Sequence, residues 1–406
     1  MPNTADVVII GAGSFGTSLA FHLAHLGVGR VVLIDKHDPV SQTTSRAAGL
    51  SCEVQPTAFL TRMASSSVRM IERFETDTGE TFTWHQPGSL KIATTDQNAQ
   101  RLKQDVARGQ QSGIKIDLLS PEDAAALSPF VQPGPIVAAG YTTTDIYFEP
   151  DELPRAYLRA AQRLGVTVMS NTCVQAINLR GDTVESVVTD QTMISTPVVI
   201  DAAGAWSALL GDMVDVHIPV VPTRHQLFIT KPIAAAHPDL PIVRMMDVNV
   251  YTRPCKGGLM LGGYEPAPMM FDARSMDCDL QVNRLELDVS VLDALARRIT
   301  EVMPVFTTAE IAEHRGGLPT MTPDGQPLLG PLPGIEGFHV LTGCCVGGLT
   351  KSPALGLALA HWIVNGGPDQ DMSAAAPDRF DDRYDSSGAL VDACRWQYSH
   401  HYHKSK

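Results

Sequence analysis

The chain has 406 residues, of which 44% are hydrophobic and 18% charged, and its formal net charge is −13. This composition indicates an ordinary globular protein with a sizeable core and excludes a disordered or fibrous chain. The acidic balance and the lack of any basic run argue against binding to phosphate backbones or anionic lipids, so we expect no nucleic-acid and no membrane partner.

Compartment and metal content are predicted from what the sequence lacks. No apolar run approaches the roughly 20 residues that span a bilayer, and the first predicted strand starts at Asp6, which leaves no room for a signal peptide. We therefore expect a cytoplasmic protein. Seven cysteines without CxxC spacing predict no zinc site. We also predict no metal at His400, His401 and His403, which we expect to form a solvated end of the chain.

The first 35 residues predict a βαβ unit. Residues 6–10 form a short β-branched run typical of a buried parallel strand, residues 17–26 are periodic like a helix, and residues 30–34 form a second strand. The pattern Gly-x-Gly-x-x-Gly lies between the first strand and the helix. Strand, glycines, helix and strand in this order are typical of a dinucleotide site.

Each glycine of this pattern has a physical role if a dinucleotide binds. Gly11 permits a tight turn, Gly13 lets the backbone approach a pyrophosphate, and Gly16 lets the helix pack closely on the strand. The helix N-terminus offers N–H groups to the phosphates. Asp35, at the end of the second strand, can accept hydrogen bonds from a ribose diol. NAD and FAD share this pattern, so the pattern alone does not choose between them.

Three further segments combine small and polar residues, at 41–50, 198–206 and 338–351. The last of them runs from a predicted strand into a glycine-rich turn. Ser352 and Pro353 then predict the cap and first turn of a helix. A second glycine-rich helix start so far from the first fits a cofactor long enough to touch both.

Together these segments resemble the D-amino-acid-oxidase (DAO) superfamily of flavoproteins, and most closely the flavin half of its sarcosine/dimethylglycine dehydrogenase branch. The segments that carry the resemblance are the N-terminal glycine pattern, TTSRAAGL at 43–50, AGAW at 203–206, RHQ at 224–226, GLMLGGYEP at 258–266, GLPTMTPDGQPLLGP at 317–331, the turn at 343–351 and RWQYSHHY at 395–402.

The resemblance implies an α/β fold with two interleaved domains. A Rossmann-like FAD-binding domain is expected over residues 1–80, 145–212 and 312–370. A substrate domain with an antiparallel or mixed β-sheet is expected over 81–144 and 213–311, and residues 371–406 would form a C-terminal tail. The sheet of the substrate domain would cover the flavin ring.

FAD is therefore the expected cofactor. We expect it to contact Gly11, Gly13, Ser14, Phe15, Gly16, Asp35, Lys36, Thr43, Thr44, Ser45, Arg46, Ala47, Gly49, Leu50, Val174, Ala203, Gly204, Trp206, Gly317, Gly343, Gly347, Gly348, Leu349, Thr350 and Lys351.

Three positions depart from the pattern of the resembling enzymes. Arg46 stands where the dehydrogenases carry a His that tethers FAD, and Gly317 stands where monomeric sarcosine oxidases carry a tethering Cys. We therefore predict noncovalent FAD. Met260 stands where those oxidases carry a Lys that helps O₂ accept electrons. This substitution favours a dehydrogenase.

Candidate catalytic residues come from both predicted domains. In the dimethylglycine-oxidising relatives, a His in the context of His225 and a Tyr on a following strand face the substrate amine. Tyr251 and Tyr264 are both candidates for that Tyr. An amino-acid substrate also needs a cation for its carboxylate, and the candidates are Arg46 first, then Arg253, Arg315 and Lys351.

These features predict an FAD-dependent oxidoreductase that acts on the C–N bond of a small secondary or tertiary amine, such as an N-methyl or N-alkyl amino acid. Electrons would pass on to an acceptor protein or to O₂, and folate handling would be either absent or supplied by a separate folate-binding or other partner subunit. The alternatives are an FAD-dependent D-amino-acid or imino-acid dehydrogenase, an NAD(P)-dependent dehydrogenase, and a flavin-bearing subunit of a hetero-oligomeric amine dehydrogenase.

Overall fold

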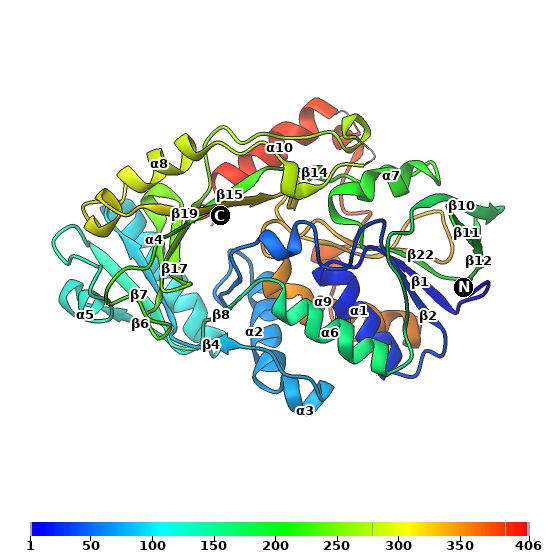
Figure 1. Ribbon diagram of the computed structural model, residues 1–406, viewed down its shortest axis with the longest axis horizontal. Coiled ribbons are helices and arrows are strands. Elements are labelled where there is room, and N and C mark those ends of the chain that lie inside the picture. The colour runs from blue at the N-terminus through cyan, green and yellow to red at the C-terminus, as the bar shows by residue number, and fades with distance from the viewer. Residues whose placement is uncertain (1, 278, 386, 404–406) are drawn as a thin grey trace.

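The computed structural model describes residues 2–277, 279–385 and 387–403. It contains two large β-sheets, each covered by helices (Figure 1). This mixed α/β architecture confirms the predicted fold class.

The first large sheet has six strands in the order β21-β22-β13-β1-β2-β9. They are β1 (Val7–Ile10), β2 (Val31–Ile34), β9 (Thr167–Met169), β13 (Val199–Asp201), β21 (Leu328–Pro331) and β22 (Phe338–Thr342). All neighbours pair in parallel except β21 and β22. Every residue of β1 and β2 is buried, because both faces of the sheet are covered.

Four helices cover one face of the six-stranded sheet (Figure 1). They are α1 (Ser14–His25), α2 (Ala58–Glu72), α6 (Glu152–Arg163) and α9 (Gly348–Asn365). A three-stranded sheet of β10 (Val174–Arg180), β11 (Thr183–Thr189) and β12 (Met193–Ser195) covers the other face. Its Ile177 and Val187 pack with Val8 and Val199 in one cluster.

The second large sheet has eight strands in the order β19-β15-β18-β17-β16-β5-β7-β6. They are β5 (Ser89–Ala93), β6 (Ile116–Leu119), β7 (Ala138–Thr142), β15 (His225–Thr230), β16 (Ile242–Met245), β17 (Val250–Cys255), β18 (Gly258–Gly263) and β19 (Ile311–Gly317). Only β16 and β5 pair in parallel.

Side chains alternate between the two faces of this sheet. Phe228, Val243 and Leu261 pack under α8 (Val289–Arg297) through its Leu292 and Leu295. On the opposite face, α4 (Asp96–Gln111) covers β5, β6 and β7. Beyond α4 this face carries His225, Tyr251 and Arg244, and all three line a cavity.

The remaining elements lie outside the two large sheets. They are β3 (Leu50–Ser51), β4 (Trp84–His85), β8 (Ile146–Phe148), β14 (Val221–Pro222), β20 (Thr320–Met321), α3 (Phe74–Thr78), α5 (Pro121–Ala126), α7 (Ser207–Asp212), α10 (Ser387–Ser399), and the 3₁₀ turns η1 (Thr44–Arg46), η2 (Gly204–Trp206), η3 (Met246–Val248), η4 (Ala273–Ser275), η5 (Val282–Arg284), η6 (Pro304–Thr307), η7 (Ser373–Ala375) and η8 (Asp382–Tyr384).

The chain crosses between the two sheets several times, as interleaved domains require. Strands of the six-stranded sheet come from residues 7–34, 167–201 and 328–342, and strands of the eight-stranded sheet come from 89–142 and 225–317. Strand β19 pairs with β15, although we placed its residues from 312 onwards in the nucleotide domain. The domain boundaries themselves stay a prediction.

The observed start of helix α9 differs from the predicted one. It begins at Gly348, so Pro353 lies inside the helix and not in its first turn. Proline lacks the N–H that would bond the carbonyl of Leu349. The Ser352 hydroxyl donates to that carbonyl at 3.5 Å and supplies part of the missing contact.

Within the described residues, no helix is both long enough and apolar enough to cross a bilayer.

Candidate active site

A cavity of about 250 Å³ opens at the carboxyl ends of β1, β2 and β13. At two positions beside this cavity, the backbone lies so close to a carbonyl oxygen that only glycine fits. Gly11 has a φ of 109°, and a Cβ there would lie 2.4 Å from the Ala202 carbonyl oxygen. A Cβ on Gly16 would lie 1.8 Å from the Gly11 carbonyl oxygen. These two glycines therefore permit the turn and the packing of α1 on β1.

The first turn of α1 faces this cavity without a side-chain cap. The Ser14 N–H donates to Thr44 Oγ1 at 3.1 Å. The other N–H groups of the turn and the positive end of the helix dipole can bind phosphate. Gly13 keeps the approach open, because the nearest atom to an added Cβ is Thr44 Oγ1 at 3.1 Å.

Asp35 lies at the end of β2 beside the cavity. Its Oδ2 accepts the Ala12 N–H at 2.7 Å and its Oδ1 accepts the His37 N–H at 2.8 Å. Burial raises the pKa of the carboxyl to about 6. Lys36 Nζ lies 4.2 Å from the centre of the Trp206 ring on the same wall. This end of the cavity suits a ribose and its base.

A second cavity, of about 160 Å³, adjoins the first and shares Ser14, Thr43 and Thr44 with it. One wall is the turn before α9, where Gly343, Cys345 and Val346 have φ values of 68°, 45° and 62°. Helix α9 also lacks a side-chain cap. Two uncapped helix starts thus line one continuous space, and this arrangement fits an extended dinucleotide such as FAD.

The eight-stranded sheet forms the opposite wall of the second cavity through His225, Tyr251 and Tyr264. His225 Nε2 lies 2.8 Å from Tyr251 Oη, and its Nδ1 lies 2.7 Å from Tyr398 Oη. Gly262 stands opposite Tyr251 and leaves room for its ring, because a Cβ there would lie 2.2 Å from Tyr251 Oη. Burial lowers the pKa of His225 to about 4, so the imidazole stays neutral at pH 7.

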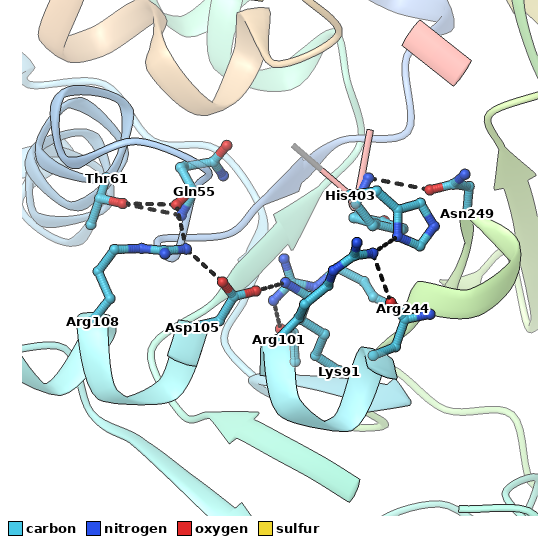
Figure 2. A network of polar contacts seen from close by, with 12 residues as sticks. Gln55, Thr61, Lys91, Arg101, Asp105, Arg108, Arg244, Asn249 and His403 are labelled. Carbon is cyan, nitrogen blue, oxygen red and sulfur yellow. Dashed lines mark hydrogen bonds and ion pairs between the residues drawn. The ribbon is translucent and has the colours of Figure 1, made fainter. Parts of the chain in front are cut away.

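Residues after α10 complete this wall. His401 stacks on Tyr264, with ring centres 4.0 Å apart, and both His401 and Tyr402 line the cavity. The Tyr402 N–H donates to Asn249 Oδ1 at 3.2 Å, and His403 Nδ1 lies 2.9 Å from Arg101 Nη1 (Figure 2). The end of the described chain is therefore packed against the site, contrary to our expectation of a solvated end.

The structure gathers the predicted site residues into these two cavities with few exceptions. Those lining the first cavity include Gly11, Gly13, Ser14, Phe15, Asp35, Lys36, Thr43, Thr44, Val174, Ala203, Gly204, Trp206 and Gly343. Those lining the second include Arg46, Ala47, Gly49, Leu50, His225, Tyr251, Tyr264, Gly317, Gly347, Gly348, Leu349, Thr350 and Lys351. Gly16 packs behind the turn, and the Ser45 hydroxyl donates to the Gln42 carbonyl at 3.1 Å.

Two of the candidate carboxylate-binding cations lie elsewhere. Arg253 is paired with Glu149 at 2.9 Å and lines a separate cavity beyond β17. Arg315 lies 3.7 Å from the same Glu149. Three residues at the site were not predicted from the sequence: Arg244, Tyr398 and Tyr402. Tyr398 and Tyr402 lie in the RWQYSHHY segment that carried the resemblance, whereas Arg244 lies in a strand that no motif marks.

The glycine-lined cavity, the acidic residue at the end of β2 and the second cavity under a mixed sheet define a dinucleotide-dependent oxidoreductase. The sequence profile of FAD-dependent oxidoreductases (DAO) matches residues 6–362. The chain belongs to this family, and its cofactor is FAD.

Similar proteins agree with this assignment. Mouse (Mus musculus) mitochondrial sarcosine dehydrogenase is 31% identical over 402 residues, which are 98% of this chain and 43% of that protein. Rat (Rattus norvegicus) mitochondrial dimethylglycine dehydrogenase is 29% identical, over 93% of this chain and 45% of that protein. This chain thus spans less than half the length of these two relatives. The crystal structure of L-proline dehydrogenase from P. horikoshii shares the fold, with a TM-score of 0.85, 23% identity and coverage of 94% and 98% of the two chains.

Proposed function

We propose that the protein oxidises the C–N bond of a small secondary or tertiary amine, an N-methyl or N-alkyl amino acid, to an imine that water hydrolyses. The observation that carries this proposal is the buried pair of hydrogen bonds joining Tyr251, His225 and Tyr398 beside the second cavity. The relatives named for sarcosine and dimethylglycine support the substrate class.

Bound FAD would supply the acceptor for a hydride equivalent from the substrate carbon. The chain's own residues would prepare the amine. Removing hydride from carbon requires a free lone pair on nitrogen, so the amine must bind without its extra proton. Neutral His225 can accept the Tyr251 phenol proton at Nε2, while Tyr251 Oη accepts either the N–H of a neutral secondary amine or the proton that a tertiary ammonium gives up on binding. Tyr398 holds the imidazole through Nδ1.

The turn before α9 would serve the cofactor. The first N–H groups of α9 and the buried Lys351 line the second cavity and would stabilise negative charge on a reduced flavin ring bound there. The aromatic side chains of Tyr264, His401 and Tyr402 would exclude water from the amine until the imine is formed.

The test is anaerobic reduction of the purified flavoprotein by a panel of N-alkyl amino acids, D-amino acids, proline and simple amines. We expect sarcosine or dimethylglycine to bleach the visible flavin absorbance. Tyr251→Phe should slow this bleaching by about 10²-fold. Tyr147→Phe is the matched control, because the Tyr147 phenol donates to the Pro238 carbonyl outside the site.

Other outcomes would contradict the proposal in distinct ways. Bleaching by D-amino acids alone would assign the chain to D-amino-acid oxidation. Reduction by dithionite but by no amine would indicate a flavin-bearing subunit without catalysis of its own.

A further inference from the structure

Tyr398 brings a second tyrosine to His225 from outside the eight-stranded sheet. It lies on α10 and is 1% exposed. Its Oη is 2.7 Å from His225 Nδ1, while Tyr251 Oη is 2.8 Å from Nε2 of the same ring. The imidazole therefore joins two buried phenols, and of these only Tyr251 lines the second cavity. Tyr398 continues the chain of hydrogen bonds away from that cavity.

A buried carboxylate lies in the surroundings of the Tyr398 phenol. Glu265 directly follows Tyr264 in the sequence, and the ring centre of Tyr264 is 5.4 Å from that of Tyr398. Glu265 is paired with Arg224, the residue before His225, at 3.8 Å, which is too long for a hydrogen bond. Both members of this pair are 6% exposed, and the charges of both act on the Tyr398 phenol.

The carboxylate and its neighbours have polar atoms left over. Four of them are buried and have no hydrogen-bond partner among the described residues, namely Glu265 Oε1, Arg224 Nε, Gln226 Nε2 and His314 Nε2. Arg224 and Gln226 both bond to the backbone of residues 286–288, and the charge of Arg224 acts on His314. Buried polar atoms need partners, and water commonly supplies them. Glu265 therefore has an oxygen free to accept from Tyr398, directly or through water.

The end groups of this chain of hydrogen bonds set its direction. A neutral imidazole donates from one nitrogen only, and an ionised carboxylate only accepts. With Glu265 as the last acceptor, the Tyr398 hydroxyl donates towards it and His225 donates from Nδ1 to Tyr398. Nε2 is then left to accept the Tyr251 hydroxyl, and the lone pairs of Tyr251 Oη face the cavity. This is the direction that proton transfer from a bound ammonium requires.

We propose that Tyr398 and Glu265 are positioning residues of the amine oxidation, and that they carry the proton of the bound ammonium out of the second cavity. This inference rests on the proposed function. One proton moves at each step: from the ammonium nitrogen to Tyr251 Oη, from Tyr251 to His225 Nε2, from His225 Nδ1 to Tyr398, and from Tyr398 to Glu265. The nitrogen keeps the electron pair of its broken N–H bond, and the carboxylate becomes a neutral carboxylic acid.

The surroundings of Glu265 suit an acceptor that takes up a proton and releases it in each turnover. Burial raises the pKa of its carboxyl, while the charge of Arg224 lowers it and that of Asp288 raises it. Tyr398 faces it from α10 and is neutral. Asp288 is exposed, so the proton has a way to solvent past residues 286–288.

His225 suits a group that passes a proton on without keeping it. Burial lowers the pKa of its imidazole to about 4. The side chains stacked or edge-on against its ring are the phenols of Tyr251, Tyr264 and Tyr398. None of these is charged at neutral pH, so no fixed charge holds the proton on the ring.

The direction of the chain is tested without substrate. ¹⁵N NMR of FAD-loaded protein with labelled histidine shows which ring nitrogen of His225 carries the proton, and the spectrum of His225→Gln identifies its signals. We expect the proton on Nδ1 in wild type and on Nε2 in Tyr398→Phe, because phenylalanine cannot accept it. A proton on Nε2 in wild type would overturn the path, since Nε2 could then not accept from Tyr251.

The pH dependence of flavin reduction tests the role of Glu265. Reduction by the best amine of the panel is followed anaerobically, well below saturation, from pH 7 upwards. Wild type should react at a nearly constant rate up to the pKa of the free amine, because the protein removes the proton itself. Glu265→Gln and Tyr398→Phe should be about 10²-fold slower at pH 7 and recover about tenfold per pH unit, because they oxidise only amine already deprotonated in solution.

Two further variants serve as controls for the carboxylate. Glu265→Asp keeps the acceptor and should retain the wild-type pH dependence. Glu53→Gln removes a carboxylate that is also 6% exposed but lines neither cavity, and it should leave the profile unchanged.

Folding must be separated from proton transfer, because Glu265→Gln leaves Arg224 buried without its counter-charge. FAD content reports whether each variant is folded. The double variant Arg224→Gln/Glu265→Gln removes both charges and should show the same recovery with pH.

The outcomes separate this inference from the proposed function. If an amine reduces the flavin, equal rates in wild type and the folded variants, or a loss that stays constant with pH, would overturn the path. If no amine reduces the flavin, the proposed function fails, and the NMR result still decides the role of Tyr398. A proton on Nδ1 that Tyr398→Phe moves to Nε2 supports that role, and a proton unaffected by the substitution overturns it.

Discussion

At the scale of single residues, burial changes the pKa of Asp35, a residue predicted to bind the cofactor. Asp35 was predicted from its place after the second strand, and the structure adds that both of its oxygens already accept backbone N–H groups. Burial raises its pKa to about 6, from an ordinary value near 3.8. A ribose diol would donate to the ionised carboxylate, so the charge state of Asp35 should control cofactor affinity.

We predict that the affinity of the apoprotein for FAD falls as the pH falls through about 6. Below its pKa the carboxyl is protonated and is a poorer acceptor, so the Kd should rise by up to about tenfold per pH unit. Titrations of apoprotein with FAD between pH 5 and 8, followed by flavin fluorescence, measure this directly. Asp35→Asn should bind FAD more weakly with little pH dependence, and a flat wild-type profile would contradict the role of Asp35.

The stability of the apoprotein should respond to Asp35 with the opposite sign. Its folded-state pKa lies above the unfolded value, so the buried charge costs stability above about pH 6. This cost is relieved as the pH falls and the folded state takes up a proton first. Comparing wild type with Asp35→Asn therefore separates the contribution of this residue from that of the buried histidines.

Some residues of the site could be predicted and others could not, for a physical reason. His225 and Tyr251 could be predicted because the resemblance covers their segments, and the structure joins them by a hydrogen bond. Arg244 could not be predicted, because a lone arginine in an apolar strand does not show which face of the sheet it occupies or which residues it contacts. Tyr398 could not be predicted, because its partner His225 is 173 residues away in the sequence.

At the scale of elements, the 3₁₀ turn η1 bears on the prediction that the flavin is not tethered to the protein. It places Thr44 against the start of α1 and Arg46 against the Gly316 carbonyl. Neither the guanidinium of Arg46 nor Gly317 can form a covalent bond to a flavin. The resembling enzymes use these two positions for their tethers, which is why we predict noncovalent FAD.

Acid precipitation of the purified protein tests this prediction. The yellow chromophore should remain in the supernatant and have the chromatographic retention of FAD. Colour that stays with the pellet would contradict it. Peptide mapping would then examine Cys52, Cys344 and Cys345, which are the cysteines lining the second cavity among the described residues.

The start of helix α9 was predicted wrongly from its local sequence. Ser and Pro are good helix starters, so the sequence favoured a start at Ser352. The helix instead begins at Gly348, because tertiary contacts outweigh this preference. The Ser18 hydroxyl donates to the Ser352 carbonyl at 2.8 Å, and a Cβ on Gly356 would lie 2.5 Å from that hydroxyl oxygen. Close packing on α1 thus extends α9 towards the cavity.

At the scale of the whole molecule, the two interleaved sheets follow from segments that the sequence made visible. The βαβ unit at the N-terminus and the strand before the glycine-rich turn predict a parallel sheet, and they pair through β13 as expected for one sheet. The register of the eight-stranded sheet was not predictable, because pairs such as β15 with β19 and β5 with β16 join strands that lie far apart in the sequence. That register makes Tyr251 and Arg244 cross-strand neighbours, and both line the second cavity.

The eight-stranded sheet also bears on which acceptor takes the electrons from the reduced flavin. Met260 lies on β18, is fully buried and packs in one cluster with Tyr251, Tyr264 and Cys345. A neutral thioether cannot stabilise the negative charge that develops on O₂ as an ammonium can. We therefore predict that amine-reduced protein reoxidises slowly in air and rapidly with an artificial acceptor such as ferrocenium. Stopped-flow mixing with air-saturated buffer and with ferrocenium compares the two rates.

The variant Met260→Lys places an ammonium at this position and should raise the rate of reoxidation by O₂ by about 10²-fold, provided its FAD content shows that it folds. Met321→Lys is the matched control, since Met321 is equally buried in the same cluster but lies on β20, outside the eight-stranded sheet. Wild-type reoxidation in air as fast as anaerobic reduction by the amine would contradict the prediction and make the protein an oxidase. A similar gain in both variants would show that any nearby positive charge suffices, and Met260 would then not be the position that limits the reaction with O₂.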